Sequence, residues 1–494
     1  MKKKIYKTGL VHGVFDFIHI GHIEHFREAK KYCNKLIASV TADKFVNKGP
    51  NRPAFSIKER INFLKSITFI DEVLISNNET AIQSINKIKP DVYFKGLDYD
   101  KIDKNNKNNL NKEIKELRRF GGKFFITKTK LRSSSKILND NFNFIKPDTK
   151  KFLKSINKKE LLERLKNNLF TKHKLVKHKN ILVSGEQILD YYTNVTLQGK
   201  SQKSSVISAV KQKTSKYGGG SILVVNLLSE FTNKLNYLVH GNQKIKKTIN
   251  NFLVNKKKIN LILSGDKSQK FLIKERFIES YSKARLFQLN QNQRFLNLNK
   301  DNKKYQKIFL ENIKKFQNIL IFDFGYGYID DKFANTIKDK KNNFYINCQT
   351  NSSNYGFNLF SKYRKAEILC VDEAEFRLTV KNKNEGIKKL IMENHNLLKN
   401  YKIFVVTCGS KGCFVFKNKI VQFIPTVYET TLDTTGCGDI FFSTFVYFYI
   451  QEKFSLNEIS LLSHIAAGLH GLSEGNKNVV SKDYFFQSAQ TVLK

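Results

Sequence analysis

The chain turns from a strand into a helix at Gly13-Val-Phe15-Asp16-Phe-Ile-His19-Ile-Gly21-His22. Residues 7–14, which lead into this stretch, are strand-like, and apolar side chains recur at helical spacing after it. Short apolar runs and helical patterns then alternate as far as residue 140. Alternation of this kind predicts a parallel sheet whose two faces are covered by helices.

The first region contains a series of expected elements. We predict strands at 7–14, 35–41, 72–76 and 91–95, and helices at 21–32, 56–66 and 80–88. Ser56 and Glu59 have the spacing of a capping box. Residues 101–116 are rich in Lys and Asn, so we expect a surface loop that runs into a helix ending near Phe120.

The two histidines of the opening stretch suggest phosphate chemistry. His19 and His22 stand three residues apart at a helix start and therefore share one face. Gly21 allows a phosphate to approach the backbone, and the helix N-terminus offers free N–H donors. The imidazoles could donate to charge that builds up while a second phosphate attacks. Two histidines on a surface helix are the structural alternative, against which the preceding Gly13, Phe15 and Asp16 argue.

Residues 9–137 resemble the cytidylyltransferase-like nucleotidyltransferases, whose G-x-F-D-x-x-H-x-G-H signature they contain in full. Lys95-Gly-Leu-Asp98-Tyr99 resembles the K-G-x-D-Y segment of the sugar-phosphate branch, and Arg132-Ser-Ser134-Ser135-Lys-Ile137 resembles the S-T-T-x-I phosphate-binding helix start. Helix capping alone would also explain the serines. The resemblance implies that Lys48 and Arg52 clamp a triphosphate, although loop cations are equally explained as solvated charge, and that Arg60 faces the nucleotide. The implied site residues are His19 and His22 for catalysis and Gly13, Phe15, Asp16, Gly21, Lys48, Arg60, Asp98, Ser134 and Ser135 for nucleotide or phosphate binding.

A second phosphate signature lies near the end of the chain. Gly436-Cys437-Gly438-Asp439 precedes an apolar helix that begins at Ile440. Small residues at a helix start expose N–H groups that cradle a transferring phosphoryl group, and Asp439 can take a proton from the attacking hydroxyl. A glycine helix cap is the alternative, which the leading Asp433-Thr-Thr and the buried helix make less attractive.

Residues 180–494 resemble the PfkB (ribokinase-like) sugar kinases, with Cys437 at the Ala position of their D-T-x-G-A-G-D signature. Weaker segments occur in family order: Gly185 to Asp190, Tyr217-Gly-Gly219-Gly220 with Asn226, Asp372-Glu-Ala-Glu375, and Thr407-Cys-Gly409-Ser-Lys-Gly412. The resemblance implies Asp439 as base; Asp190, Gly219, Gly220, Asn226 and Asp439 around the sugar; Thr407, Gly409, Gly412, Gly436, Cys437 and Gly438 around the nucleotide; and Asp372 and Glu375 as indirect magnesium residues. Asp372 replaces the usual Asn, and residues 346–353 lack the D-P-x-basic pattern of the family.

The expected architecture is α/β with two domains. Residues 1–140 are predicted to be a Rossmann-like nucleotidyltransferase domain, 141–179 a helical linker, and 180–494 a ribokinase-like domain with a small lid near 190–216. The basic amphipathic pattern at 151–169 favours an interdomain spacer over a membrane-surface helix. In the last domain we expect strands at 181–184, 222–228, 259–263, 319–324, 344–346, 368–371 and 403–407.

Composition limits the class of protein. The formal net charge is +44, but Lys is spread along the chain together with abundant Asn, Ile and Phe, the bias of an AT-rich coding sequence. No RRM, zinc or helix-turn-helix pattern supports nucleic-acid binding. The six cysteines form no C-x-x-C pair, which favours reduced thiols and a cytoplasmic location. The apolar run 440–450 is too short to span a bilayer, and the N-terminus does not resemble a signal peptide.

The pairing of signatures resembles the bifunctional heptose kinase/nucleotidyltransferases, in which the kinase comes first, whereas here it comes second. The leading hypothesis is an enzyme of nucleotide-sugar synthesis that uses Mg²⁺ and ATP to phosphorylate a sugar or sugar phosphate, and ATP or CTP for nucleotidyl transfer. One alternative is a transferase whose kinase fold only binds substrate. Another is a basic nucleic-acid-binding or scaffold protein. A homodimer is compatible with both families, and the sequence leaves the sugar and the transferred nucleotide open.

Overall fold

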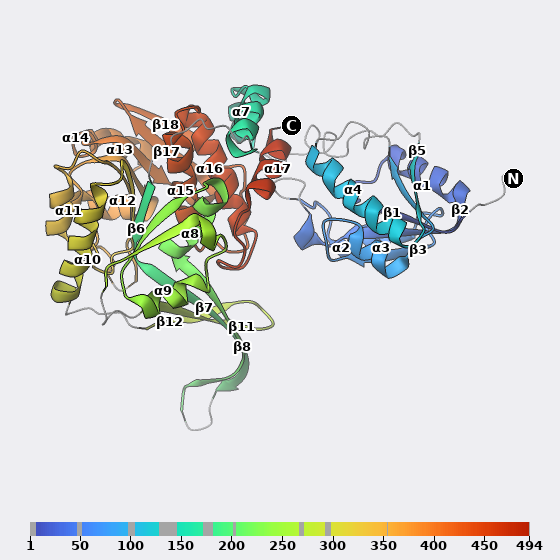
Figure 1. The fold of residues 1–494 in the computed structure, drawn as a ribbon, viewed down its shortest axis with the longest axis horizontal. Helices are drawn as coiled ribbons and strands as arrows, with labels where there is room; N and C mark the ends of the chain where they lie inside the picture. Colours follow the sequence, from blue (N-terminus) through green and yellow to red (C-terminus); the bar gives the residue numbers. More distant parts are fainter. Residues whose placement is uncertain are drawn as a thin grey trace. The chain divides into compact units, whose positions relative to one another are not determined.

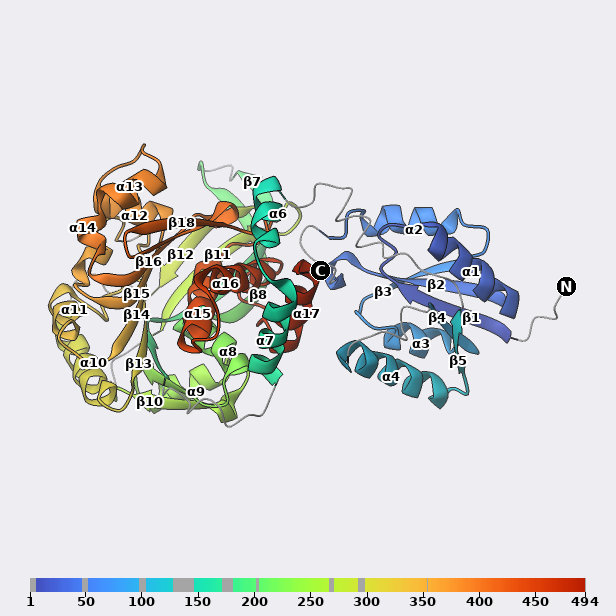
Figure 2. The same cartoon turned by 90° about the horizontal axis from the view of Figure 1, so that it is seen from above.

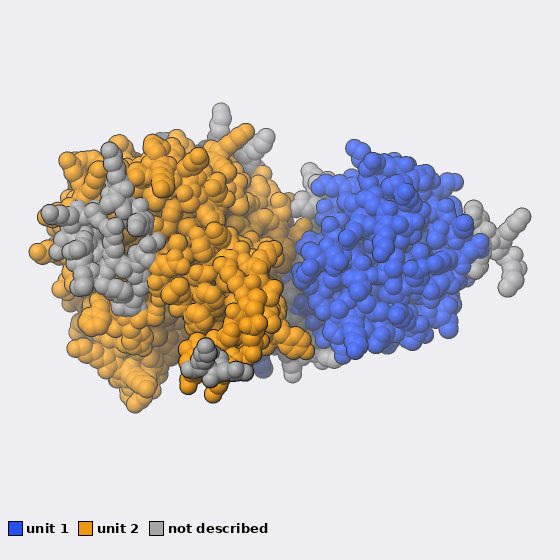
Figure 3. Space-filling model, turned by 90° about the horizontal axis from the view of Figure 1, so that it is seen from below, with its two compact units in different colours: residues 1–150, 490–492, 494 blue, residues 151–489, 493 orange. Residues whose placement is uncertain are grey.

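The computed structural model describes residues 6–46, 52–96, 104–127, 146–170, 181–200, 204–265, 271–291, 298–352 and 354–493. The chain divides into two compact units, shown in Figure 3. The first comprises residues 1–150 with 490–492 and 494, and the second comprises residues 151–489 with 493. No helix in the described part is both long enough and apolar enough to cross a membrane.

Within its described residues, the first unit is built on a sheet in the order β3-β2-β1-β4-β5, with all neighbours parallel. The strands are β1 (Tyr6–Gly13), β2 (Cys33–Thr41), β3 (Glu72–Ser76), β4 (Val92–Gly96) and β5 (Lys123–Thr127). The strand order reverses between β1 and β4, and ligands of open α/β sheets bind at the carboxyl ends of the strands beside such a reversal. The α/β prediction for this region is confirmed.

The helices of the first unit are α1 (Ile20–Tyr32), α2 (Ile57–Lys65), α3 (Ile82–Ile88) and α4 (Lys104–Arg119). Ser56 caps α2 and forms the predicted capping box with Glu59. The prediction of a loop at 101–116 was wrong, because α4 begins at Lys104. Leu110 and Leu117 of α4 are buried in an apolar cluster with Tyr93, so tertiary packing stabilises a helix that the polar composition conceals.

The second unit contains a main sheet in the order β10-β9-β6-β13-β14-β15-β16-β17-β18 over the described residues. Its strands are β10 (Ile259–Leu263), β9 (Leu235–Val239), β6 (Ile181–Gly185), β13 (Asn318–Asp323), β14 (Asn343–Cys348), β15 (Ala366–Asp372), β16 (Tyr401–Thr407), β17 (Gly412–Lys417) and β18 (Ile420–Pro425). In this sheet order, all neighbouring strands from β10 at one edge as far as β16 are parallel. Strands β17 and β18 then extend the sheet in antiparallel fashion.

Helices cover both faces of the main sheet (Figure 2). One face carries α8 (Ser221–Phe231), α15 (Cys437–Ile450) and α16 (Leu456–Gly471), and the other carries α10 (Leu298–Ile313), α11 (Asp331–Ile337), α12 (Glu373–Val380), α13 (Ile387–Glu393) and α14 (His395–Leu398). The unit also contains α9 (Gln243–Asn250), and α17 (Lys482–Val492) lies at the end of the chain. The strand predicted at 222–228 is helix α8. All of these residues are buried, and a continuous apolar run does not distinguish a buried strand from a buried helix.

A second sheet, the lid sheet, has the order β12-β11-β7-β8 in the described residues. It contains β7 (Gln187–Lys200), β8 (Ile207–Gly220), β11 (Leu272–Glu279) and β12 (Arg285–Gln291). Figure 1 shows the β7–β8 hairpin extending away from the body of the unit. The lid predicted near residues 190–216 corresponds to this hairpin.

The segment predicted as a linker contains α6 (Pro147–Lys154) and α7 (Lys158–Phe170). Helix α7 packs within the second unit. Arg164 forms an ion pair with Glu458 of α16 at 2.6 Å, and Tyr447 of α15 donates to Asn168 at 3.1 Å. Buried Leu161 and Leu165 complete this contact face, so α7 is a structural layer of the second unit.

Candidate active sites

The first site begins where β1 ends at Gly13. Phe15 follows with a φ of 50°, a left-handed conformation that is strained for an aromatic residue. Its ring packs edge-on against Phe26 and His22 of α1, with centroid distances of 5.4 and 5.9 Å. A Cβ at Gly13 would lie 3.1 Å from the Phe15 ring, which favours glycine here. The strained turn directs the chain from the strand edge into α1.

His19 and His22 are brought together at the start of α1. His19 is the N-cap residue, and its Nδ1 accepts the N–H of Gly21 at 3.1 Å. The backbone N–H of His19 in turn donates to Nδ1 of His22 at 3.4 Å, and the two ring centroids are 4.2 Å apart. An imidazole nitrogen that accepts a hydrogen bond carries no proton, so each neutral ring holds its proton on Nε2. The backbone thus fixes two N–H donors at a helix N-terminus.

Asp16 organises the loop that follows. Its carboxylate accepts from Arg52 Nε at 2.5 Å and from the backbone N–H groups of Ala54 and Phe55 at 3.0 Å each. Arg52 and Asp16 are both buried. The family resemblance implies that Asp16 binds the nucleotide or its phosphate, and in the structure its carboxylate holds residues 52–55.

Arg60 does not occupy the predicted position facing the nucleotide. Its side chain is 1 % exposed, and the guanidinium forms an ion pair with Asp43 at 2.5 Å. It also donates to the carbonyls of Val14, Thr41 and Phe55 at 2.5, 2.9 and 3.0 Å. These bonds tie α2 to the carboxyl ends of β1 and β2. Arg60 is therefore a structural residue beneath the site.

Two buried histidines beside this site were not predicted. His12 contacts Ser39 Oγ at 3.1 Å and His25 contacts Thr127 Oγ1 at 2.7 Å through their Nδ1 atoms. Burial, with a smaller contribution from the Lys95 charge, lowers the pKa of each to about 4. Both are therefore neutral at pH 7. The predicted residues Lys48, Asp98, Ser134 and Ser135 lie outside the described residues.

The second site lies in the second unit, at the base of the lid sheet. Asp190 of β7 forms an ion pair with Arg276 of β11 at 2.5 Å and accepts from Asn476 Nδ2 at 2.8 Å. Gly219 of β8 lies directly against it, because a Cβ at this glycine would overlap Asp190 Oδ2. The structure thus places Asp190 and Gly219, both predicted to lie around the sugar, in direct contact. Gly220 has a φ of 56° and is the N-cap residue of α8.

The sugar-kinase resemblance predicts that Gly219→Ala impairs binding of the sugar acceptor, because the added methyl group must displace the Asp190 carboxylate. A displacement of about 1 Å in a positioned group costs on the order of 100-fold in rate. Steady-state kinetics with the phosphorylated product as readout should show a loss of that size in kcat/KM for the acceptor. Gly386→Ala is the matched control, since its Cβ would meet no atom within 4 Å. Equal kinetics for both variants would contradict the assignment of Gly219.

Asp439 stands in the first turn of α15 and is buried. Burial raises its pKa to about 7, while a hydrogen bond from Gln349 and the charge of Lys274 oppose the rise. Gln349 Nε2 donates to Asp439 Oδ1 at 2.6 Å. A carboxyl group whose pKa lies near neutrality can exchange a proton at physiological pH, as a general base must.

The loop before α15 forms a cradle of backbone donors. Gly436 has a φ of 80° and caps the helix, and Gly438 has no atom within 4 Å of where a Cβ would be. In the described part of the chain, the N–H groups of Gly438 and Asp439 donate to no acceptor. Free N–H groups at the positive end of a helix bind anions. Burial raises the pKa of Cys437 to about 12, so this neighbouring thiol stays protonated.

Asp433 holds this cradle in place. The backbone N–H groups of Thr435 and Gly475 each donate to its carboxylate at 2.8 Å, and Arg285 of β12 forms an ion pair with it. Burial opposes ionisation of Asp433, but these bonds outweigh it and hold the pKa below its usual value. Asp433 is thus an anion that joins the lid sheet to the cradle.

Lys274 of β11 was not predicted from the sequence. Its ammonium group faces the Tyr326 ring at 5.4 Å and lies near the carboxylates of Asp190, Asp439 and Glu186, yet it forms no ion pair within the described residues. Burial lowers its pKa, and the carboxylates oppose that effect. The alternation Lys274-x-Arg276 in a strand, which places two cations on one face, was the available signal. A desolvated lysine without an ion pair is suited to an anionic ligand.

The carboxylates of the acidic pair at the start of α12 accept hydrogen bonds from backbone N–H groups. The Asp372 side chain accepts from Glu375 N–H at 2.7 Å, and Glu375 accepts from the N–H groups of Asp372 and Thr350 at 2.8 and 2.9 Å. Burial and the Asp372 charge raise the pKa of Glu375 to about 8. Among the described residues, no group of three or more His, Cys, Asp or Glu side chains could hold a metal ion. Direct coordination by this pair is therefore not supported.

The remaining predicted residues lie on β16, on the turn after it, on β17 and on α8. Thr407 ends β16, and Gly409, with a φ of 53°, begins the turn that leads to Gly412. Asn226 does not join the sugar site. Its amide nitrogen donates to Phe252 O at 2.8 Å and its amide oxygen accepts from Val254 N–H at 3.1 Å, so both polar atoms are engaged by the backbone.

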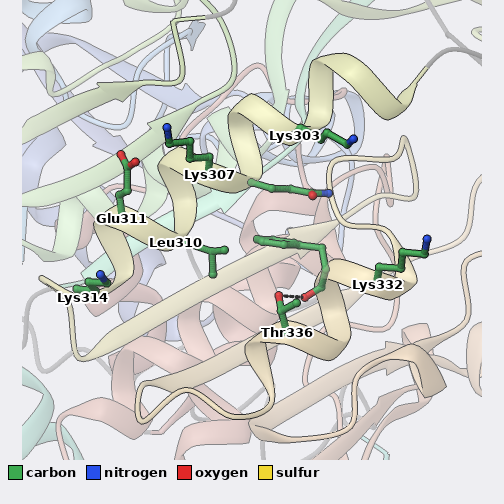
Figure 4. A pocket seen from close by; sticks show the side chains of 9 residues that line it. Lys303, Lys307, Leu310, Glu311, Lys314, Lys332 and Thr336 are labelled. Carbon is green, nitrogen blue, oxygen red and sulfur yellow. Dashed lines mark hydrogen bonds between the residues drawn. The ribbon is translucent and has the colours of Figure 1, made fainter.

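A groove of about 440 Å³ lies between α10 and α11 (Figure 4). It is lined by Lys303, Gln306, Lys307, Leu310, Glu311, Lys314, Lys332, Phe333 and Thr336. None of the predicted site residues lines it. The chain has 87 Lys and Arg residues, so lysines are expected on any part of its surface. The groove is therefore not a candidate for either phosphate site.

Two family models match separate parts of the chain. Residues 10–140 match the model described as cytidylyltransferase-like, and residues 281–477 match the model described as pfkB family carbohydrate kinase. The chain joins a cytidylyltransferase-like region to a pfkB-family region. The histidines at the start of α1 belong to the cytidylyltransferase-like region, and the Asp439 cradle belongs to the pfkB-family region.

Curated relatives match the cytidylyltransferase-like region. The bifunctional protein HldE of Paramagnetospirillum magneticum is 39% identical over 105 residues, which is 21% of this chain and 21% of the relative. The bifunctional protein HldE of Campylobacter fetus subsp. fetus is 37% identical over 89 residues, 18% of this chain and 19% of the relative. The chain spans about a fifth of the length of the curated relatives it matches.

A solved structure resembles the pfkB-family region. A mutant of phosphofructokinase-2 from Escherichia coli aligns with a TM-score of 0.50 and 12% sequence identity, over 64% of this chain and 99% of that chain. At this identity the likeness concerns the fold alone. It agrees with the ribokinase-like architecture predicted for the second region.

Proposed function

We propose that this chain is a bifunctional enzyme of nucleotide-sugar synthesis, with nucleotidyl transfer in residues 1–140 and sugar phosphorylation in residues 180–494. Two observations support the proposal: paired imidazoles at the start of one helix, and a buried carboxylate with free backbone donors at the start of another. The family matches and the HldE relatives support the combination.

In the transferase step, a phosphate oxygen of the acceptor attacks the α-phosphorus of ATP or CTP. A new P–O bond forms, the bond to the β-phosphate bridge breaks, and pyrophosphate leaves. His19 and His22 donate through Nε2 to the oxygens on which negative charge accumulates. Because their Nδ1 atoms are held by the backbone, these donors are oriented before the substrate arrives.

In the kinase step, Asp439 accepts the proton of the attacking sugar hydroxyl, whose oxygen bonds to the γ-phosphorus of ATP as ADP leaves. The N–H groups of Gly438 and Asp439 stabilise the phosphoryl oxygens. Asp190, with Gly219 behind it, accepts from sugar hydroxyls. Magnesium would accompany the nucleotide phosphates and contact Asp372 and Glu375 through water, since both carboxylates are engaged by backbone N–H groups.

The acceptor of the kinase step is proposed to carry an anionic group, as a sugar phosphate does. Lys274 supplies a desolvated positive charge beside Asp190 and Asp439 that makes no ion pair within the described residues, so its N–H donors are available to an anionic group of the acceptor. The reduced cysteines of the described residues support a cytoplasmic location.

We expect Lys274→Met to reduce discrimination in favour of a phosphorylated acceptor. Hydrogen bonds to charged groups contribute about 1.5–3 kcal/mol, so KM for a sugar phosphate should rise at least tenfold, while KM for the unphosphorylated sugar changes little. Steady-state phosphorylation assays with both acceptors measure the ratio. Lys213→Met, at an exposed position of β8, is the control. An unchanged ratio in Lys274→Met would remove Lys274 from acceptor recognition.

The proposal as a whole is tested with purified protein, ATP, CTP and a panel of sugars and sugar phosphates. Mass spectrometry should detect an ATP-dependent phosphorylated sugar and a nucleotide-linked product with release of pyrophosphate. A nucleotide-linked product without phosphorylation of any acceptor would favour a kinase fold that only binds substrate. The absence of both products would refute the bifunctional proposal.

A further inference from the structure

Gln349 lies immediately after β14, and hydrogen bonds fix both its backbone and its side chain. Its backbone N–H donates to Asp323 O at 2.8 Å, and its backbone carbonyl accepts from Asn358 Nδ2 at 2.8 Å. The side-chain Nε2 donates to Asn347 Oδ1 at 2.5 Å and to Asp439 Oδ1 at 2.6 Å. Because both partners are acceptors, the amide nitrogen and not the amide oxygen must face Asp439.

The two oxygens of Asp439 are consequently in different situations. Oδ1 is engaged by Gln349, whereas Oδ2 makes no hydrogen bond within the described residues and is not sealed from solvent. A carboxylate held at one oxygen by a rigid donor cannot rotate freely, so the second oxygen has a defined direction. An exposed glutamine would not have this property, because its side chain would have no fixed orientation.

We propose that Gln349 is a positioning residue for the kinase base, orienting Asp439 so that Oδ2 receives the proton of the acceptor hydroxyl. The inference rests on the proposed kinase function and concerns a residue in the stretch 346–353, where the sequence departs from the family pattern. Gln349 touches no substrate in this arrangement. It acts through Asp439 by favouring the ionised carboxylate and by fixing its direction.

Other groups around Asp439 also affect its ionisation. Lys274 from β11 lowers the pKa of Asp439, and Asp190 from β7 raises it. Glu375 from α12 and Cys437 from α15 also interact with the Asp439 charge. Substitution of Gln349 by a residue of similar size without a donor leaves all four in place, so a change in the titration of Asp439 reports the lost amide bond.

The test compares Gln349→Leu with the unaltered protein over pH 5 to 9. Loss of a donor to the carboxylate raises the pKa of Asp439, so the acid limb of the kinase pH profile should move upward by about one unit. At a pH below that limb, kcat should fall about tenfold, while KM for the acceptor changes little. Gln349→Glu places a second carboxylate beside Asp439 and should move the limb further in the same direction.

A direct titration separates this inference from the proposed function. Infrared difference spectra of the Asp439 carboxyl, identified by subtraction of Asp439→Asn, should show the same upward shift in Gln349→Leu even if no acceptor is phosphorylated. Gln422→Leu, at an exposed position of β18, is the control and should match the unaltered protein in both readouts. An unshifted carboxyl band, or a loss confined to KM, would overturn the positioning role.

Discussion

Asp439→Asn should slow ATP-dependent phosphorylation at least about 100-fold while leaving nucleotidyl transfer at its original rate. The asparagine side chain keeps the volume of the buried group but cannot take the proton of the attacking hydroxyl. General-base catalysis contributes about 10²- to 10⁴-fold, so kcat for phosphorylation should fall by that factor. A coupled assay for ADP and a separate assay for pyrophosphate, on the same preparation, measure the two activities independently.

The control for this substitution is Asp339→Asn, which removes one carboxylate from an exposed position outside the site. It should leave both activities unchanged. If Asp439→Asn retained full phosphorylation, Asp439 would not be the base. If the unaltered protein showed nucleotidyl transfer alone, the kinase fold would be a substrate-binding domain.

The same variant should alter stability in a direction set by the raised pKa of Asp439. The folded protein retains this proton up to about pH 7, whereas the unfolded chain loses it near the ordinary aspartate pKa of about 4. The folded state therefore binds more protons, and the Asp439 contribution to stability decreases as pH rises from about 4 to about 7. Urea unfolding should show Asp439→Asn gaining stability relative to the unaltered protein across that interval.

The sequence correctly predicted the elements whose hydrophobic pattern matches the way their side chains are buried in the fold. The alternation of strands and helices in the first unit was confirmed almost residue for residue at β3 and α2, because turn residues and a capping box define their ends. It was insufficient for α8, whose apolar residues are buried all round and therefore show no helical period. Asn226, which the sugar-kinase resemblance assigned to the sugar site, lies in α8, where its side chain bonds the backbone of Phe252 and Val254.

Contacts between segments that are far apart in the chain could also not be predicted from the sequence. Gln349 follows β14, Lys274 belongs to the lid sheet, and Asp439 lies in the first turn of α15, so their proximity exists only in the folded chain. No local pattern distinguishes Lys274 from the many other lysines of a chain with net charge +44. What distinguishes it is burial without an ion pair, a property of tertiary structure.

His19→Asn and His19→Ala should lose nucleotidyl transfer equally but differ in stability. Both variants lack the Nε2 donor, and removal of one preorganised donor to a developing charge costs about 10²- to 10³-fold in kcat. Asn is a favoured N-cap residue whose side-chain oxygen can accept the N–H of Gly21, as His19 Nδ1 does at 3.1 Å. Ala cannot, so His19→Ala should lose about 1 kcal/mol of helix-capping stability.

This pair of variants distinguishes catalysis from capping, because the histidine performs both functions in the structure. Pyrophosphate release measures the first and thermal unfolding measures the second, with phosphorylation by the second unit as an internal reference. If His19→Asn kept its nucleotidyl transfer, the ring of His19 would serve α1 alone. The charge on the transferring phosphate would then be stabilised by His22 and the backbone N–H groups, and His22→Asn would become the variant that removes activity.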